Sequence, residues 1–174
     1  MENQPMDVIT AINTRRSIRR YTEEAISEED LHTILTAGLS APSATNRRPI
    51  HIIVIRKKET LQLLSAINSH GKMIEKAPVC LVVAADRNAQ PVKELYLNDG
   101  SAVIENILVA VNGIGLGAVW IGVYHFASWY NELLRITALP ENLIPVGLIA
   151  MGHPDEKKVT GDRYDPTKVH QEIF

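Results

Sequence analysis

The sequence predicts a mixed α and β fold in a single domain. A chain of 174 residues suits one domain, which would bury about two-thirds of the surface that its unfolded chain exposes. Continuous apolar runs of strand length lie between segments whose apolar residues recur at helical spacing. No internal repeat or low-complexity segment interrupts this pattern. Residues 1–174 are therefore expected to form one domain.

Four apolar runs bounded by turn residues predict β-strands. They are residues 50–55, 79–85, 118–123 and 144–151. The first two contain almost no polar residues, so both are expected to be buried on both faces of a sheet. His51 in the first run is accordingly expected to be a buried structural histidine. Gly122 near the end of the third run is a position where another group can approach the backbone closely.

Five segments with apolar residues at helical spacing predict helices. They are residues 6–13, 27–39, 59–67, 96–116 and 128–137. The second has the clearest boundaries, because Ser27 is a favourable N-cap, acidic residues follow it, and Pro42 comes after its end. The fourth is apolar nearly all round, which requires burial at the centre of the domain or against another subunit. Its glycines (Gly113, Gly115 and Gly117) follow a helix, so they fit a C-cap and tight turn better than a dinucleotide-binding motif.

The composition limits the classes of partner and compartment. The 18 basic and 20 acidic residues give a net charge of -2, which argues against a general nucleic-acid or membrane-surface role. The one cysteine, Cys80, excludes an internal disulfide, and its apolar neighbours favour a buried structural thiol over a nucleophile. The polar N-terminus lacks the features of a signal peptide, and no apolar run approaches the ~18 residues of a membrane span. We therefore expect a soluble, cytoplasmic protein with no nucleic-acid or membrane partner.

The basic residues concentrate in residues 14–21, Thr-Arg-Arg-Ser-Ile-Arg-Arg-Tyr, between the first two predicted helices. We call this stretch the arginine segment. Guanidinium groups bind phosphate or carboxylate oxygens in a bidentate manner, and Ser17 adds a hydroxyl donor. The plainer interpretation is a solvated basic face or a cationic group at a helix C-terminus. Taken alone, the segment favours that plainer interpretation.

A second polar loop, residues 42–49, contributes a serine hydroxyl, an asparagine amide and two more guanidinium groups. Turn chemistry alone would account for Ser43 and Asn46. The chain has no metal-ligand spacing among its histidines, no nucleophile motif and no P-loop. Neither a metal nor a catalytic side chain is therefore expected. Anion-binding loops without a nucleophile or metal favour an enzyme whose chemistry is supplied by a cofactor.

Four blocks of residues, in this order along the chain, resemble the nitroreductase family of FMN-dependent flavoproteins. They are Arg15-Arg16-Ser17-Ile18-Arg19, Pro42-Ser43-Ala44-Thr45-Asn46, residues 115–122, and Gly152-His153-Pro154 followed by Arg163. The resemblance extends from about residue 6 to residue 163. It implies an α+β fold with a central, mostly antiparallel sheet flanked by helices, assembled as an intertwined homodimer with FMN at the subunit interface. Helix 96–116 would then be the dimer helix, and residues 152–174 a C-terminal extension on the partner subunit.

The resemblance also implies which residues bind the cofactor. Those for the phosphate and ribityl chain are Arg15, Arg16, Ser17 and Arg163. Those for the flavin ring are Arg19 at the pyrimidine edge, Pro42, Ser43, Ala44 and Asn46 in the loop, and Ile121 and Gly122 at a strand end. A cation at Arg19 would stabilise negative charge on the reduced ring and so raise its reduction potential.

The activity that the resemblance implies is transfer of electrons from NADH or NADPH, through FMN, to a nitroaromatic or quinone-like acceptor by a ping-pong mechanism. The chain departs from the common family pattern at Arg48, where many members have glutamine, and it has only a compact segment, residues 123–140, in the substrate-covering region. The substrate and the nicotinamide preference are left open. Two alternatives are a flavoprotein of the same fold that dehalogenates or cleaves a flavin, and a nonenzymatic polyanion-binding protein.

Overall fold

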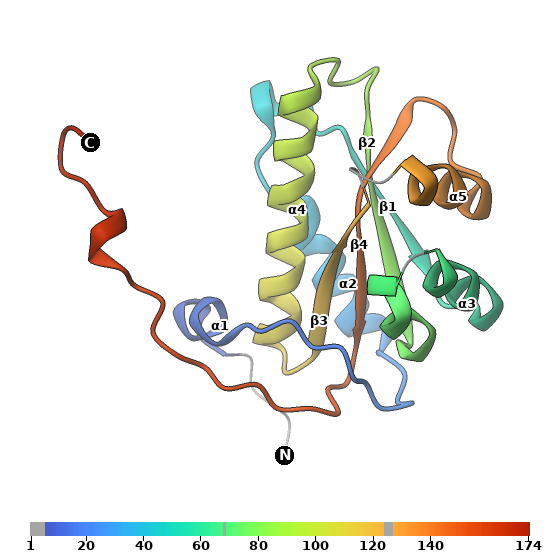
Figure 1. Ribbon diagram of the computed structural model, residues 1–174, viewed down its shortest axis with the longest axis horizontal. Helices are drawn as coiled ribbons and strands as arrows, with labels where there is room; N and C mark the ends of the chain where they lie inside the picture. The colour runs from blue at the N-terminus through green and yellow to red at the C-terminus, as the bar shows by residue number, and fades with distance from the viewer. Residues whose placement is uncertain (1–5, 68, 124–126) are drawn as a thin grey trace.

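A four-stranded antiparallel sheet forms the centre of the computed structural model, which describes residues 6–67, 69–123 and 127–174 (Figure 1). Its strands are β1 (Ile50–Ile55), β2 (Val79–Asp86), β3 (Gly117–Gly122) and β4 (Leu143–Gly152), in the order β1-β2-β4-β3. Every neighbouring pair is antiparallel. The predicted α+β class with an antiparallel sheet is confirmed, whereas the intertwined homodimer stays a prediction.

Five α-helices occur in the described ranges, and the sheet lies between helices on its two faces, so that the domain has three layers (Figure 1). They are α1 (Val8–Thr14), α2 (Glu28–Leu39), α3 (Lys58–Ala66), α4 (Lys93–Gly113) and α5 (Ala127–Thr137). Short 3-10 helices occur at η1 (Ala44–Asn46), η2 (Ser69–Lys76) and η3 (Pro166–Lys168). The expected helices are all present, with ends shifted by a few residues.

Alternate residues of the two inner strands supply two separate hydrophobic cores. Leu81 and Ile149 point toward α2 and α4, where they pack with Ile107. Val82 and Leu148 point to the opposite face, toward α3 and α5. Because both faces are covered by helices, β2 and β4 are apolar at nearly every position and are buried along almost their whole length.

The expectation that β1 is buried on both faces was wrong. Only Ile55 of this strand is fully buried, and His51, expected to be a buried structural residue, is exposed. The physical reason is topological: β1 lies at the edge of the sheet, so the helices that cover β2 and β4 shield it incompletely. An apolar run alone does not distinguish an edge strand from a central one.

The long helix α4 packs against the sheet, α1 and α2. A Cβ atom at Gly38 of α2 would lie 2.6 Å from Ile107 Cγ1, so the two helices are in close contact at this glycine. Asn112 near the end of α4 donates hydrogen bonds of 2.9 Å to Ala11 O and to Thr14 Oγ1, which fix α1. The predicted tight turn after the helix is confirmed, because Gly115 adopts a φ of 86° that favours glycine.

Residues 153–174 leave the sheet as an extended, largely exposed tail (Figure 1). The beginning of this tail pairs with the end of the arginine segment and the residue after it, through hydrogen bonds from Thr22 N to His153 O and from Asp155 N to Arg20 O, both at 2.9 Å. That the tail packs on a partner subunit stays a prediction. Across the described ranges, no helix is long and apolar enough to cross a membrane.

Candidate functional site

The arginine segment is held in an extended conformation along the edge strand β3. Ser17 forms a parallel bridge with Ala118, and Ile18 N donates a 2.9 Å hydrogen bond to Ala118 O. The Tyr21 hydroxyl lies 2.6 Å from Ile18 O and 2.9 Å from Ala150 O, and burial raises the pKa of this phenol, which keeps it a neutral donor. Since extended residues advance by roughly 3.3 Å each, the arginines before and after Ser17 serve different places.

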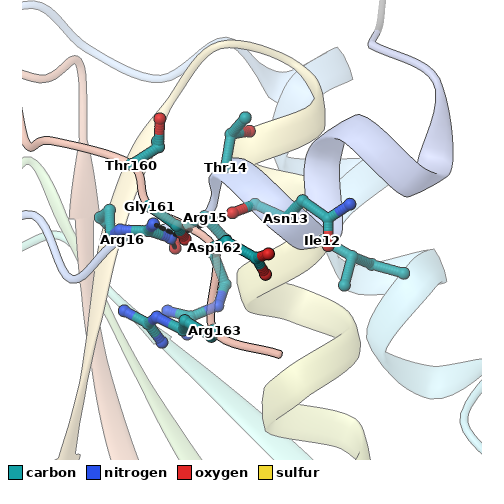
Figure 2. Close-up of a pocket in the computed structure, with 9 residues that line it drawn as sticks. All are labelled: Ile12, Asn13, Thr14, Arg15, Arg16, Thr160, Gly161, Asp162 and Arg163. Atoms are coloured by element: carbon teal, nitrogen blue, oxygen red, sulfur yellow. Dashed lines mark hydrogen bonds between the residues drawn. The ribbon is translucent and has the colours of Figure 1, made fainter. Parts of the chain in front are cut away.

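The first of these places is a cavity of about 560 Å³ between the end of α1 and the C-terminal tail. Figure 2 shows its lining side chains. They are Ile12, Asn13, Thr14, Arg15 and Arg16 from the N-terminal part of the chain, and Thr160, Gly161, Asp162 and Arg163 from the tail. The structure therefore brings together three of the four residues predicted for the phosphate and ribityl chain, from positions about 150 apart in sequence.

The three arginines at this cavity have different surroundings. Arg15 Nε forms a 3.3 Å ion pair with Glu105 of α4, which leaves its terminal nitrogens available. Arg163 is exposed, and in the described ranges no hydrogen bond or ion pair engages its guanidinium. Arg16, by contrast, directs its guanidinium at backbone carbonyl groups on both sides of the cavity. Asp162 places a carboxylate at the same cavity, where its Oδ1 accepts a 2.8 Å hydrogen bond from Tyr164 N.

The second place is a cavity of about 410 Å³ over the outer part of β3. It is lined by Arg19, Ser69, His70, Met73, Val119, Trp120, Ile121, Gly122 and Trp129. Three predicted ring contacts, Arg19, Ile121 and Gly122, thus meet at one cavity. A Cβ atom at Gly122 would meet no heavy atom within 4 Å, so the strand end is open toward the cavity.

Arg19 is fixed by the carboxylate of Glu156, which accepts a 2.6 Å hydrogen bond from Arg19 N. The other oxygen of Glu156 lies 2.8 Å from Lys158 Nζ. The hydrogen bond from the Lys158 side chain, followed by those from the backbone of the arginine segment, holds the pKa of Glu156 below its ordinary value. Glu156 is therefore ionised at neutral pH and ties the tail to the arginine segment.

The four predicted loop residues do not join either cavity within one chain. Pro42 and Ser43 line a separate space of about 30 Å³ beside Asp99 of α4, and Ala44 and Asn46 belong to η1. This loop lies by the N-terminal half of α4, whereas the arginine segment lies near its C-terminal end (Figure 1).

Hydrogen bonds hold this loop in an unusual backbone conformation. Ala44 N donates to Asp99 Oδ1 at 2.8 Å, and Arg48 N donates to Ser43 Oγ at 2.8 Å. Thr45, Asn46 and Arg48 have φ values of 52°, 55° and 49°, a region that non-glycine residues rarely adopt. Ser17 likewise lines neither cavity and pairs with β3 between them.

Several contributors to the site were not identified from the sequence. His70 of η2 and Trp129 of α5 reach the second cavity, with ring centroids 6.2 Å apart, and Met73 lies there as well. Trp129 could have been identified from the sequence, because it is a tryptophan in a short helix that follows a strand end. No sequence feature indicates Met73 or Glu156. His125 follows the third predicted strand, where it could contact a ligand, although the sequence alone favours a structural role; it lies outside the described residues.

Cys80 is fully buried, and burial raises the pKa of its thiol to about 12, so the expected inert structural thiol is confirmed. Among the residues that the structure describes, no group of three His, Cys, Asp or Glu side chains is placed to hold a metal ion.

Fold and site together define an α+β protein with an arginine-lined cavity and a second, smaller cavity bounded by aromatic side chains, both along one extended segment. The family model described as the nitroreductase family matches residues 12–70 and 62–153. The chain belongs to the nitroreductase family, and the family predicted from the four sequence blocks is confirmed.

Individual relatives agree with this assignment. A Methanothermobacter thermautotrophicus protein, named provisionally as an NADH dehydrogenase/NAD(P)H nitroreductase, is 39% identical over 167 residues, covering 96% of this chain and 87% of its own. A Bacillus subtilis protein called "FMN reductase, NAD(P)H" is 30% identical over 187 residues, covering 97% and 74%. A crystal structure from Desulfovibrio desulfuricans, provisionally called a nitroreductase and in complex with FMN, is 35% identical with a TM-score of 0.84, covering 97% and 98%.

Proposed function

We propose that this chain is an FMN-dependent oxidoreductase that takes electrons from NADH or NADPH and reduces a small organic acceptor. The observation that carries the proposal is the position of the two cavities at opposite ends of residues 15–19, one rich in guanidinium groups and one bounded by aromatic rings. FMN has the matching chemistry, with a phosphate at one end of a flexible chain and a planar ring at the other. The names of the Bacillus and Desulfovibrio relatives support the same cofactor and nicotinamide donor.

The donor set fits an FMN phosphate. Arg15 and Arg163 present guanidinium nitrogens to the first cavity, and such groups form charge-assisted, bidentate hydrogen bonds with phosphate oxygens. Ser17 lies on the extended chain between the cavities, where it would face the ribityl chain of a bound FMN. Asp162 opposes the binding of a phosphate through its negative charge, so the net field depends on the arginines outnumbering it.

The second cavity fits the ring. The strand end at Ile121 and Gly122 is open toward this cavity, and Arg19 supplies a cation to the same cavity. Bound there, FMN would supply the two-electron chemistry between nicotinamide and acceptor. The chain's own contribution is to fix the ring, to stabilise negative charge next to Arg19 and to cover the site with apolar side chains.

An aromatic acceptor is the substrate class that this cavity favours. Trp120, Trp129 and His70 surround it, and aromatic side chains bind planar rings by offset stacking or edge-to-face contact. A nitroaromatic or a quinone meets this requirement, and both accept electrons without a protein nucleophile.

A homodimer would account for the two features that one chain leaves unexplained. Pro42, Ser43, Ala44 and Asn46 lie apart from the arginines, and α1 exposes Val8 and Ile9 at 63% and 62%. Exposed apolar side chains on one helix mark a contact surface. In a dimer, the loop of one chain would complete the site of the other. Sedimentation equilibrium of the FMN-loaded protein should give twice the chain mass; a monomer would exclude this arrangement.

The decisive experiment begins with the purified protein, which should be yellow and release FMN on denaturation. Stopped-flow absorbance should then show bleaching by NADH or NADPH, and mixing the reduced protein in turn with a nitroaromatic, a quinone and oxygen should identify the acceptor by the fastest reoxidation. A colourless protein that does not bind added FMN would refute the proposal. Reoxidation by none of the acceptors would favour a flavoprotein with different chemistry.

A further inference from the structure

We propose that Arg16 is a positioning residue that clamps the C-terminal tail over the arginine-rich cavity, and that it serves the cofactor phosphate by delivering Arg163 rather than by contact. The inference rests on the proposed function, because it takes the cavity to be the phosphate site. It assigns different roles to two adjacent arginines of one motif.

The hydrogen bonds of Arg16 carry the argument. Its Nε donates to Val159 O at 3.1 Å and its Nη2 to Gly161 O at 3.4 Å, both in the tail. Its Nη1 donates to Asn13 O at 3.1 Å and to Arg15 O at 2.8 Å, at the end of α1. A guanidinium has five N–H donors, so these four bonds leave one N–H of Nη2. Arg16 therefore joins the tail to α1 with most of its donors engaged.

The position of the clamp connects it to Arg163. Gly161 is separated from Arg163 by one residue, so the two Cα atoms are at most about 7 Å apart. The preceding attachment of the tail to the body is the hydrogen bond from Arg19 N to the Glu156 carboxylate, three residues before Val159. Without the bonds at Val159 and Gly161, the part of the tail that carries Arg163 would lose its attachment next to the cavity. Arg163 would then bind phosphate only after its segment had been ordered, at an entropic cost.

Charge and geometry can be separated at this residue. Lysine keeps the positive charge of arginine but replaces the planar fork with a single ammonium group, which cannot reach carbonyl groups on both sides of the cavity. A phosphate accepts lysine as a point charge. A clamp therefore fails with lysine, whereas a direct phosphate contact tolerates it.

The first test measures FMN affinity by quenching of flavin fluorescence. Arg16→Ala and Arg16→Lys should weaken binding to a similar extent, by roughly 10-fold, as expected for loss of a hydrogen bond to a charged group. Arg163→Lys should retain more affinity than Arg163→Ala. Arg20→Ala, an exposed arginine of the same segment, is the matched control and should bind FMN as the wild type does. Near wild-type affinity in Arg16→Lys would overturn the proposal.

The second test needs no cofactor. Cys80 is fully buried, so a nitroxide label reacts selectively at Val159→Cys, a position whose side chain is 92% exposed. In FMN-free protein, Arg16→Ala and Arg16→Lys should each increase label mobility in the electron paramagnetic resonance spectrum, whereas Arg163→Ala and Arg20→Ala should not. Unchanged mobility in both Arg16 variants would overturn the clamp. If the wild type bound no FMN while mobility still responded to Arg16, the proposed function would fail and the clamp would stand.

The variants must also be folded for either test to count. Circular dichroism should show the helix content of the wild type in every variant. Should Arg16→Ala lose that content, Arg16→Lys alone decides, because it preserves the charge and most of the side-chain volume.

Discussion

The two glycines that begin and end β3 should separate stability from cofactor binding. A Cβ atom at Gly117 would lie 2.8 Å from both Cβ and Cγ2 of Ile18. Ile18 is β-branched and stands between Ser17 and Arg19, so it cannot swing aside without moving the arginine segment. A Cβ atom at Gly122 would meet nothing within 4 Å and would enter the aromatic-lined cavity. Neither glycine has the positive φ that would forbid alanine.

These contacts set the expected magnitudes. Overpacking in Gly117→Ala should lower the free energy of unfolding by about 1–3 kcal/mol. Part of this loss is offset, because replacing glycine by alanine reduces the conformational entropy of the unfolded chain, which stabilises the fold by roughly 0.4–1 kcal/mol. The net loss of about 1–2 kcal/mol should lower Tm by roughly 2–8 °C in a domain of this size. Gly122→Ala should leave stability equal or slightly higher, and should weaken FMN binding because its methyl group occupies space needed by the ring.

Urea unfolding of FMN-free protein, followed by circular dichroism, measures the first effect, and fluorescence titration with FMN measures the second. We expect Gly117→Ala to lower the free energy of unfolding. Gly122→Ala should weaken FMN binding without lowering stability. Wild-type stability in Gly117→Ala would show that the arginine segment does not pack on β3 as described. Wild-type FMN affinity in Gly122→Ala would show that the flavin ring does not bind at this strand end.

Three further predictions concern charges along the arginine segment. Arg19→Ala should lower the reduction potential of bound FMN while the flavin stays bound, measured by dye-equilibrated reductive titration; an unshifted potential would remove that role. Asp162→Asn should tighten FMN binding several-fold, because the amide oxygen can still accept from Tyr164 while the repulsive charge is gone, and unchanged or weaker binding would contradict this. The pKa of Glu156 is lowered in the folded state, so its stabilising effect should be present at neutral pH and lost as the pH falls below about 4.5. Urea unfolding at several pH values should show a smaller acid loss in Glu156→Gln, and identical curves would contradict it.

Much of the fold follows from local pattern. Ser27 accepts the expected capping hydrogen bond from Asp30 N at 3.0 Å, and the turn after α4 has its predicted glycine conformation at Gly115. Those features depend on neighbours within a few residues, which the sequence displays directly. The status of β1 does not, because burial of a strand depends on whether it lies at the edge of the sheet. His51 was misjudged for that reason alone.

The candidate site shows the same division. The arginine segment was identifiable because its charge density is local and its order relative to the other motifs is distinctive. What Arg16 does was not identifiable, since its tail acceptors lie 143 and 145 residues away and are backbone carbonyls with no sequence signal. The left-handed backbone conformation at Thr45 and Arg48 could not be predicted either, because neither residue is a glycine. Tertiary hydrogen bonds, rather than residue type, determine both.

The exposed edge of β1 has a practical consequence for work with weakened variants. Ile50–Ile55 has the sequence Ile-His-Ile-Ile-Val-Ile, and none of the described strands pairs with its outer side. An apolar edge strand of this kind can join another copy of itself when the domain opens. Arg48 and Pro49 precede the strand, and Arg56, Lys57 and Lys58 follow it. The cationic residues oppose pairing because they repel the same residues of a second copy, and Pro49 has no backbone N–H to donate to a neighbouring strand. Because salt screens that repulsion, aggregation of destabilised variants should increase with ionic strength, and their unfolding is best followed in dilute, low-salt solution.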